Sequence, residues 1–123
     1  MRSGDVLIGL KSSGPHSNGY SLIRKILKDN GLEFSDVAPY SSDNSTLGED
    51  LLSPTCIYVK SLLGISQSGL VKGMAHITGG GFTENIPRIL PGHLYADIDV
   101  STWSLPPVFS WLKTAGNVES CKA

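Results

Sequence analysis

The residues best suited to chemistry lie between Ala75 and Arg88, where an apolar segment leads through three consecutive glycines into a helix start. Such a turn directs unpaired backbone N–H groups and the positive end of a helix dipole at one point, which favours an anion such as a phosphate. A turn that needs glycine only for its backbone conformation is the alternative. The run matches neither Gly-x-x-x-x-Gly-Lys-Ser/Thr nor Gly-x-Gly-x-x-Gly, so neither familiar ATP or dinucleotide site is encoded.

Polar side chains around these glycines supply candidate ligands and one candidate acid or base. His76 precedes the glycines and its imidazole titrates near neutral pH, although a satisfied core histidine is the alternative. Glu84 would repel an anion, so its functional role is to hold a ligand hydroxyl or orient a neighbour, and a carboxylate that only stabilises the first helical turn is its alternative. The candidates in this run are His76, Thr78, Gly79, Gly80, Gly81, Glu84, Asn85 and Arg88.

A second turn of the same kind occurs earlier, between an apolar run and a helical pattern. His16 lies in a predicted loop, so a functional role suits it better than a structural role in the core. Capping of the following helix is the alternative role for Ser17 or Asn18. The candidates in this turn are Ser13, Gly14, His16, Ser17 and Asn18. Two such turns, each with a histidine, suit a protein that holds a phosphorylated metabolite and moves protons beside it.

Composition predicts one domain or one lobe, because 123 residues with 40% hydrophobic content suffice for one modest core. The chain has 10 Lys plus Arg residues and 11 Asp plus Glu residues, so its net charge does not indicate binding to nucleic acid or to an anionic membrane. Cys56 and Cys121 are too few for a metal framework, and we expect free thiols in a reducing compartment and no metal site. No apolar stretch approaches the roughly 18–20 residues of a membrane span, so a soluble cytoplasmic protein is expected.

The elements that must position these turns alternate between strands and helices. Strands are predicted at 6–10, 74–77 and 96–100, and helices at 20–28, from 46, at 57–63, at 83–90 and within 103–112. Thr46 and Glu49 form a predicted capping box, and Pro54-Thr55 kinks the helix that follows and carries Cys56. Trp103, Phe109 and Trp111 are expected in the core or at a lobe interface. The pattern predicts an α/β fold, or α+β sandwich, with a mixed sheet flanked by helices.

Several motifs together resemble one known family. They are 4–10, 12–22, Pro54-Thr55 with Ile57-Tyr58, 76–82 with 84–88, and Gly116-Asn117-Val118. They resemble aminoimidazole ribonucleotide synthetase, also called phosphoribosylformylglycinamidine cyclo-ligase, which in animals forms the middle part of a trifunctional purine enzyme. The resemblance implies that residues 1–118 are most of a C-terminal lobe, cut short before the family's Arg-Thr-Phe-Asn motif. Residues 119–123 lie outside the family pattern.

The resemblance also implies an activity in purine biosynthesis. The family uses ATP and Mg²⁺ to activate the formyl oxygen of formylglycinamidine ribonucleotide, and ring closure gives aminoimidazole ribonucleotide, ADP and phosphate. It implies that His76 is the acid–base or oxygen-stabilising residue and that a preceding lobe supplies most of the ATP and metal site and the homodimer contact. The alternative is an inactive fragment or truncated isoform that binds a phosphorylated ligand or a full-length partner. Formylglycinamidine ribonucleotide synthetase and selenophosphate synthetase share the architecture more loosely.

Overall fold

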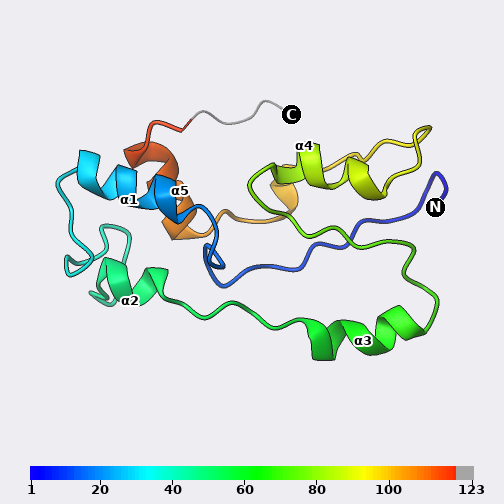
Figure 1. Ribbon diagram of the computed structural model, residues 1–123, viewed down its shortest axis with the longest axis horizontal. Helices are drawn as coiled ribbons and strands as arrows, with labels where there is room; N and C mark the ends of the chain where they lie inside the picture. The colour runs from blue at the N-terminus through cyan, green and yellow to red at the C-terminus, as the bar shows by residue number, and fades with distance from the viewer. Residues whose placement is uncertain (119–123) are drawn as a thin grey trace. The chain divides into compact units, whose positions relative to one another are not determined.

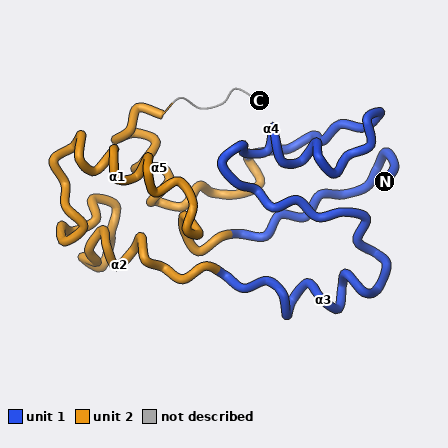
Figure 2. Tube along the Cα trace, viewed as in Figure 1, with its two compact units in different colours: residues 1–11, 56–100 blue, residues 12–55, 101–123 orange. Residues whose placement is uncertain are grey.

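The computed structural model describes residues 1–118, which belong to two compact units. Unit 1 contains residues 1–11 and 56–100, and unit 2 contains residues 12–55 and those from 101 onward, as Figure 2 shows in two colours. The helices, labelled in part in Figure 1, are α1 (Tyr20–Asp29), α2 (Leu47–Leu51), α3 (Val59–Gln67), α4 (Gly81–Asn85), the 3₁₀ turns η1 (Pro87–Ile89) and η2 (Val100–Thr102), and α5 (Pro107–Ala115). None of the described helices has the length and apolar character needed to cross a membrane.

Helix α1 confirms the prediction from its apolar spacing. Ile23, Ile26 and Leu27 are buried, and they share one face because they are three and four positions apart. The helix ends at Asp29 with Asn30 as its C-cap, and Gly31 follows with φ +65°, a conformation that glycine adopts without a steric penalty.

Helix α2 begins with the predicted capping box. The Thr46 hydroxyl accepts a hydrogen bond from the Glu49 amide at 3.2 Å, and Glu49 Oε2 accepts one from the Thr46 amide at 2.8 Å. The bond from the Thr46 amide, and then one that the Thr46 hydroxyl donates to Glu49 Oε2 at 2.9 Å, hold the pKa of Glu49 below its ordinary value. Two backbone N–H groups at the helix start are thereby satisfied within the motif.

The core of unit 2 joins α1, α2 and α5. Its buried members are Ile23, Ile26, Leu27, Ala38, Leu47, Leu51, Val108 and Leu112. Phe109 and Trp111 pack against this core, as expected, and the Trp111 and Tyr40 rings lie 5.5 Å apart between centroids. Trp103 is instead exposed.

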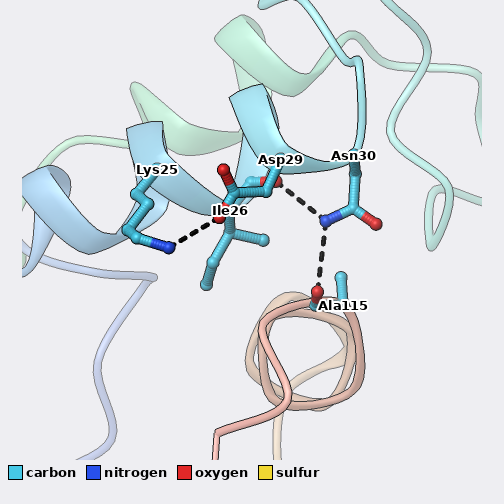
Figure 3. A network of polar contacts seen from close by, with 5 residues as sticks. All are labelled: Lys25, Ile26, Asp29, Asn30 and Ala115. Atoms are coloured by element: carbon cyan, nitrogen blue, oxygen red, sulfur yellow. Dashed lines mark hydrogen bonds and ion pairs between the residues drawn. The ribbon is translucent and has the colours of Figure 1, made fainter.

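A single amide side chain connects the C-terminal ends of α1 and α5. Asn30 Nδ2 donates to the Ile26 carbonyl at 2.8 Å and to the Ala115 carbonyl at 3.1 Å (Figure 3). The Ile26 carbonyl also accepts the Asn30 backbone amide at 3.1 Å, whereas Ala115 is the last residue of α5 and its carbonyl needs a partner from outside that helix, which Asn30 provides. On the outer face of α1, Lys25 pairs with Asp29 at 2.6 Å.

Unit 1 has little apolar packing. Ile86, at 7% exposure, is its one buried apolar residue among those described. The predicted strand at 6–10 has no regular secondary structure, and the side chains of Val6 and Ile8 are each 84% exposed. An ion pair between Lys72 and Asp5 connects that segment to the one after α3, and Lys72 holds the pKa of Asp5 below its ordinary value.

The predicted mixed sheet is absent from residues 1–118. Segments 6–10, 74–77 and 96–100 form no strand, and the one backbone bridge is antiparallel, between Val37 and Thr46 of unit 2. A strand is stabilised only when a neighbour accepts and donates its backbone hydrogen bonds, and the described part of unit 1 provides no such neighbour.

Two predicted helices also differ from the structure, and proline explains both differences. The kinked helix is two helices, because residues 53–58 are not helical and Pro54 both lacks an N–H and disfavours helix at Ser53. Cys56 therefore lies outside any helix, half-buried, and Cys121 lies outside the described residues. Pro87 likewise divides the predicted helix at 83–90 into α4 and η1.

Candidate ligand-binding loops

The glycine loop in unit 1 is a tight turn followed by a short helix. The Gly81 amide donates to the Thr78 carbonyl at 2.9 Å, which closes a four-residue turn with Gly79 and Gly80 at its centre. Gly81 has φ +61°, so a side chain at this position would be strained. Helix α4 has 5 residues, so its dipole is small and would add little to the binding of an anion.

Two predicted ligand residues, Asn85 and Thr78, are hydrogen-bonded within the loop itself. Asn85 Nδ2 donates to the Gly81 carbonyl at 2.6 Å, and Asn85 Oδ1 accepts from the Thr78 hydroxyl at 3.2 Å. Asn85 is 5% exposed. The buried Asn85 side chain therefore forms hydrogen bonds to two residues of the turn, Thr78 and Gly81.

Glu84 lies against Gly80. A Cβ atom built on Gly80 would overlap the Glu84 side chain, including its carboxylate. Gly80 thus allows close approach of the carboxylate to the turn. A carboxylate at this position would repel an anion, and the predicted role of Glu84 in orienting a neighbour stays a prediction.

The two remaining candidates in unit 1 are exposed. His76 lies between α3 and the glycine turn with an exposed side chain, so the alternative of a buried core histidine is wrong. Arg88 lies exposed in η1, beyond α4. His93 is on a surface turn in which the Leu94 amide donates to the Pro91 carbonyl at 2.9 Å.

The second loop, in unit 2, pairs a serine with a histidine. His16 Nε2 accepts from the Ser13 amide at 2.9 Å and lies 2.7 Å from Ser13 Oγ. Ser13 Oγ also donates to the Pro54 carbonyl at 2.7 Å, which connects the loop to the segment after α2.

The path of this loop excludes the capping role that the sequence suggests. His16 and Ser17 have φ 51° and 59°, and the Asn18 amide donates to the Pro15 carbonyl at 3.1 Å. The N-cap of α1 is Gly19, with φ 75° and no side-chain capping bond. Ser17 and Asn18 are exposed, whereas Gly14 is buried.

The structure brings together some predicted residues within each unit: Ser13 with His16 in unit 2, and Thr78, Gly81 and Asn85 in unit 1. Sequence reasoning missed Pro54, whose carbonyl is 41 positions from Ser13, and no local pattern signals that contact. It also missed the Tyr58 hydroxyl, which donates to the Lys11 carbonyl at 2.7 Å. Within residues 1–118, no three His, Cys, Asp or Glu side chains are grouped as metal ligands would be.

In each unit, side-chain hydrogen bonds close a turn near a histidine: Asn85 with Thr78 and Gly81 in unit 1, and His16 with Ser13 in unit 2. The family described as AIR synthase related protein, C-terminal domain, matches residues 2–122, and the chain belongs to this family. The resemblance inferred from the sequence motifs is confirmed.

Three relatives are similar to nearly the whole chain. A bifunctional purine biosynthetic protein of Schizosaccharomyces pombe is 60% identical over 115 residues, 94% of this chain and 14% of the relative. The chloroplastic phosphoribosylformylglycinamidine cyclo-ligase of Arabidopsis thaliana is 54% identical over 117 residues, 95% of this chain and 30% of the relative. The trifunctional purine biosynthetic protein adenosine-3 of Chironomus tentans is 53% identical over 117 residues, 95% and 8% respectively. The chain thus spans less than a third of each relative.

Proposed function

We propose that this chain is the C-terminal part of a phosphoribosylformylglycinamidine cyclo-ligase, an ATP-dependent enzyme that closes the imidazole ring of aminoimidazole ribonucleotide. The single observation that supports this most strongly is 54% identity to the cyclo-ligase of Arabidopsis over 95% of the chain. Membership in the AIR synthase related family supports it as well. The mixed sheet predicted from the sequence would form in the whole enzyme, where further chain provides partners for the predicted strands.

In this proposal the glycine turn binds the substrate phosphate and His76 moves the proton. Backbone N–H groups hold phosphate oxygens well, and the turn at Gly79–Gly81 is already ordered by hydrogen bonds. His76 is exposed two residues before this turn, where an imidazole can give a proton to, or take one from, a reacting nitrogen or oxygen. Arg88 adds a positive charge for the same anion.

The loop at 13–18 is proposed to contact the substrate through Ser17, Asn18 and the backbone near Gly14. His16 has a different role from His76, because its Nε2 already accepts the Ser13 amide. We therefore assign His16 to holding its loop in shape and His76 to proton transfer. That the two loops serve one substrate stays a prediction.

ATP and Mg²⁺ enter this proposal from the family, and the described residues do not fit either group. They contain no cluster of three potential metal ligands, and neither familiar ATP motif occurs in the sequence. We propose that a preceding lobe binds both, and that the whole enzyme forms the homodimer that the resemblance implies. The cytosolic location expected from the sequence also stays a prediction, and one relative is named as chloroplastic.

A second candidate function is a non-catalytic fragment that binds a phosphorylated ligand or a full-length partner. The observation that favours it is the scarcity of buried apolar residues in the described part of unit 1, where Ile86 is the one example. A unit with so little packing of its own requires another chain segment to cover it.

Complementation separates the two functions. The purified chain is mixed with a separately produced N-terminal lobe of a cyclo-ligase, and ADP release is measured with substrate. A catalytic domain restores turnover, whereas a folded mixture without turnover favours the non-catalytic fragment.

A variant then tests His76 itself. His76→Ala should lower kcat by about 10²–10⁴-fold while KM changes by less than about threefold, because general acid–base catalysis acts mainly in the transition state. His93→Ala, an exposed histidine on a surface turn, is the matched control and should leave both constants near the wild-type values. Equal losses of turnover and thermal stability in His76→Ala would contradict the catalytic role.

A further inference from the structure

We propose that Asn85 and Thr78 are positioning residues, which close the Gly79–Gly81 turn from inside and act on the ligand only through the glycine backbone. This inference rests on the proposed function, because that function gives the turn its ligand. It replaces the expectation from sequence that both side chains contact the substrate directly.

The burial and bonding of Asn85 carry the inference. Among the described residues, Asn85 is the one buried polar side chain, with 5% exposure. Its amide donates to the Gly81 carbonyl at 2.6 Å and accepts from the Thr78 hydroxyl at 3.2 Å. Burial, together with the use of one amide hydrogen and one oxygen lone pair inside the turn, leaves little of this side chain open to a ligand.

These two bonds close a ring around the turn. The Gly81 amide donates to the Thr78 carbonyl at 2.9 Å, so the Gly81 amide and carbonyl both have partners and Thr78 is held by its carbonyl and its hydroxyl. Gly79 and Gly80 lie between these fixed points. Their amides are the loop's candidate donors to a phosphate, while the Gly81 amide is already committed.

The chemistry explains why an asparagine is required at position 85. An aspartate would place a carboxylate against the Gly81 carbonyl, and an aliphatic residue would leave that partly buried carbonyl without this donor. A carboxamide supplies the donor and the acceptor on two separate atoms, which matches the two partners of Asn85. The positive φ of Gly81, +61°, is then maintained by the Asn85 bond as well as tolerated by glycine.

The test compares four variants of the full chain by amide hydrogen exchange and ¹⁵N NMR. Asn85→Leu removes both side-chain bonds without adding charge, and Thr78→Val removes one. Thr78→Ser keeps the hydroxyl and should rescue. Thr114→Val is the matched control, since it removes a hydroxyl bonded to the Ser110 carbonyl at 3.1 Å in unit 2.

We expect exchange at Gly81 to be about tenfold faster in Asn85→Leu and about threefold faster in Thr78→Val, with Thr78→Ser and Thr114→Val close to wild type. Unchanged exchange in Asn85→Leu overturns the inference. If that variant loses its dispersed spectrum, the pair Thr78→Val and Thr78→Ser decides, and equal exchange in both overturns it.

Titration with inorganic phosphate distinguishes positioning from direct contact. In the wild-type chain the Gly79 and Gly80 amides should shift while the Asn85 side-chain resonance does not, and Asn85→Leu should weaken phosphate binding about tenfold. An Asn85 side-chain shift as large as those of the glycines overturns the inference. If no glycine shifts but exchange at Gly81 responds to Asn85→Leu, the closure of the turn is supported and the phosphate role under the proposed function fails.

Discussion

Unit 2 and unit 1 differ in where their stabilising partners come from. The helices of unit 2 bury eight apolar residues in a shared core, whereas the described part of unit 1 buries Ile86 alone. Unit 1 is ordered instead by polar contacts, such as the Asn85 bonds and the Lys72–Asp5 ion pair. A helix forms its backbone hydrogen bonds within itself and needs only one covered face, whereas a strand forms all of its backbone hydrogen bonds with neighbouring strands. The difference teaches that the helical unit 2 depends less on partners outside itself than unit 1, for which the sequence predicts sheet strands.

The largest expected effect comes from the core of unit 2. Leu47→Ala removes a side chain that is fully buried between α2 and its neighbours and should lower the free energy of unfolding by about 2–5 kcal/mol. The same substitution at Leu70, which is 79% exposed in unit 1, should change it by less than about 0.5 kcal/mol. Urea unfolding followed by circular dichroism measures both. Equal effects at the two leucines would remove the distinction between the units.

A smaller effect on the stability of the glycine turn should distinguish Gly81, whose positive φ disfavours a side chain, from Gly79, where a side chain meets open space. Gly81→Ala forces a side chain into φ +61° and should disfavour the turn by about 1–2 kcal/mol, whereas Gly79→Ala meets open space. The ¹⁵N resonances of Thr78 and Asn85 report the turn, and they should shift in Gly81→Ala only. Similar spectra for both variants would mean that unit 1 is not ordered at this turn.

The smallest expected effect is a loss of folding stability at alkaline pH, caused by Tyr40 in unit 2. Burial of the phenol, and then its hydrogen bond to Asp50 at 2.7 Å, raise the pKa of Tyr40 above its ordinary value. The folded chain therefore keeps this proton at a pH where the unfolded chain has lost it, so stability is complete below about pH 10 and falls as the pH rises further. Thermal unfolding of wild type and Tyr40→Phe between pH 8 and pH 11 tests this. The variant should lose less stability than the wild type over that range, and parallel curves would exclude Tyr40 as the cause.

The sequence predicted the parts of the fold that depend on local spacing. Helix α1, its C-cap at Asn30, the capping box of Thr46 and Glu49, and the terminal helix with Phe109 are all confirmed. Each depends on residues within about one or two helical turns of one another. Strands at 6–10, 74–77 and 96–100 depend on partners far away in sequence, which apolar runs cannot identify.

The candidate site follows the same division. The glycine turn and the loop position of His16 were predicted, because both depend on adjacent residues. The inward orientation of Asn85 was not, since the sequence shows an amide in a first helical turn but not which way it points. The bond from Ser13 to Pro54 connects loops 41 positions apart, and only folding brings them together.

Unit 2 is built from two segments of the chain, and residues 56–100, which belong to unit 1, connect them in the sequence. When α1 and α5 pack and Asn30 bridges their ends, this connecting segment becomes a loop whose two ends are tethered. Further lengthening of such a loop adds little entropic cost, because closure entropy grows only with the logarithm of length. We therefore expect the helical core of unit 2 to tolerate insertions within residues 56–100 better than insertions within its own helices.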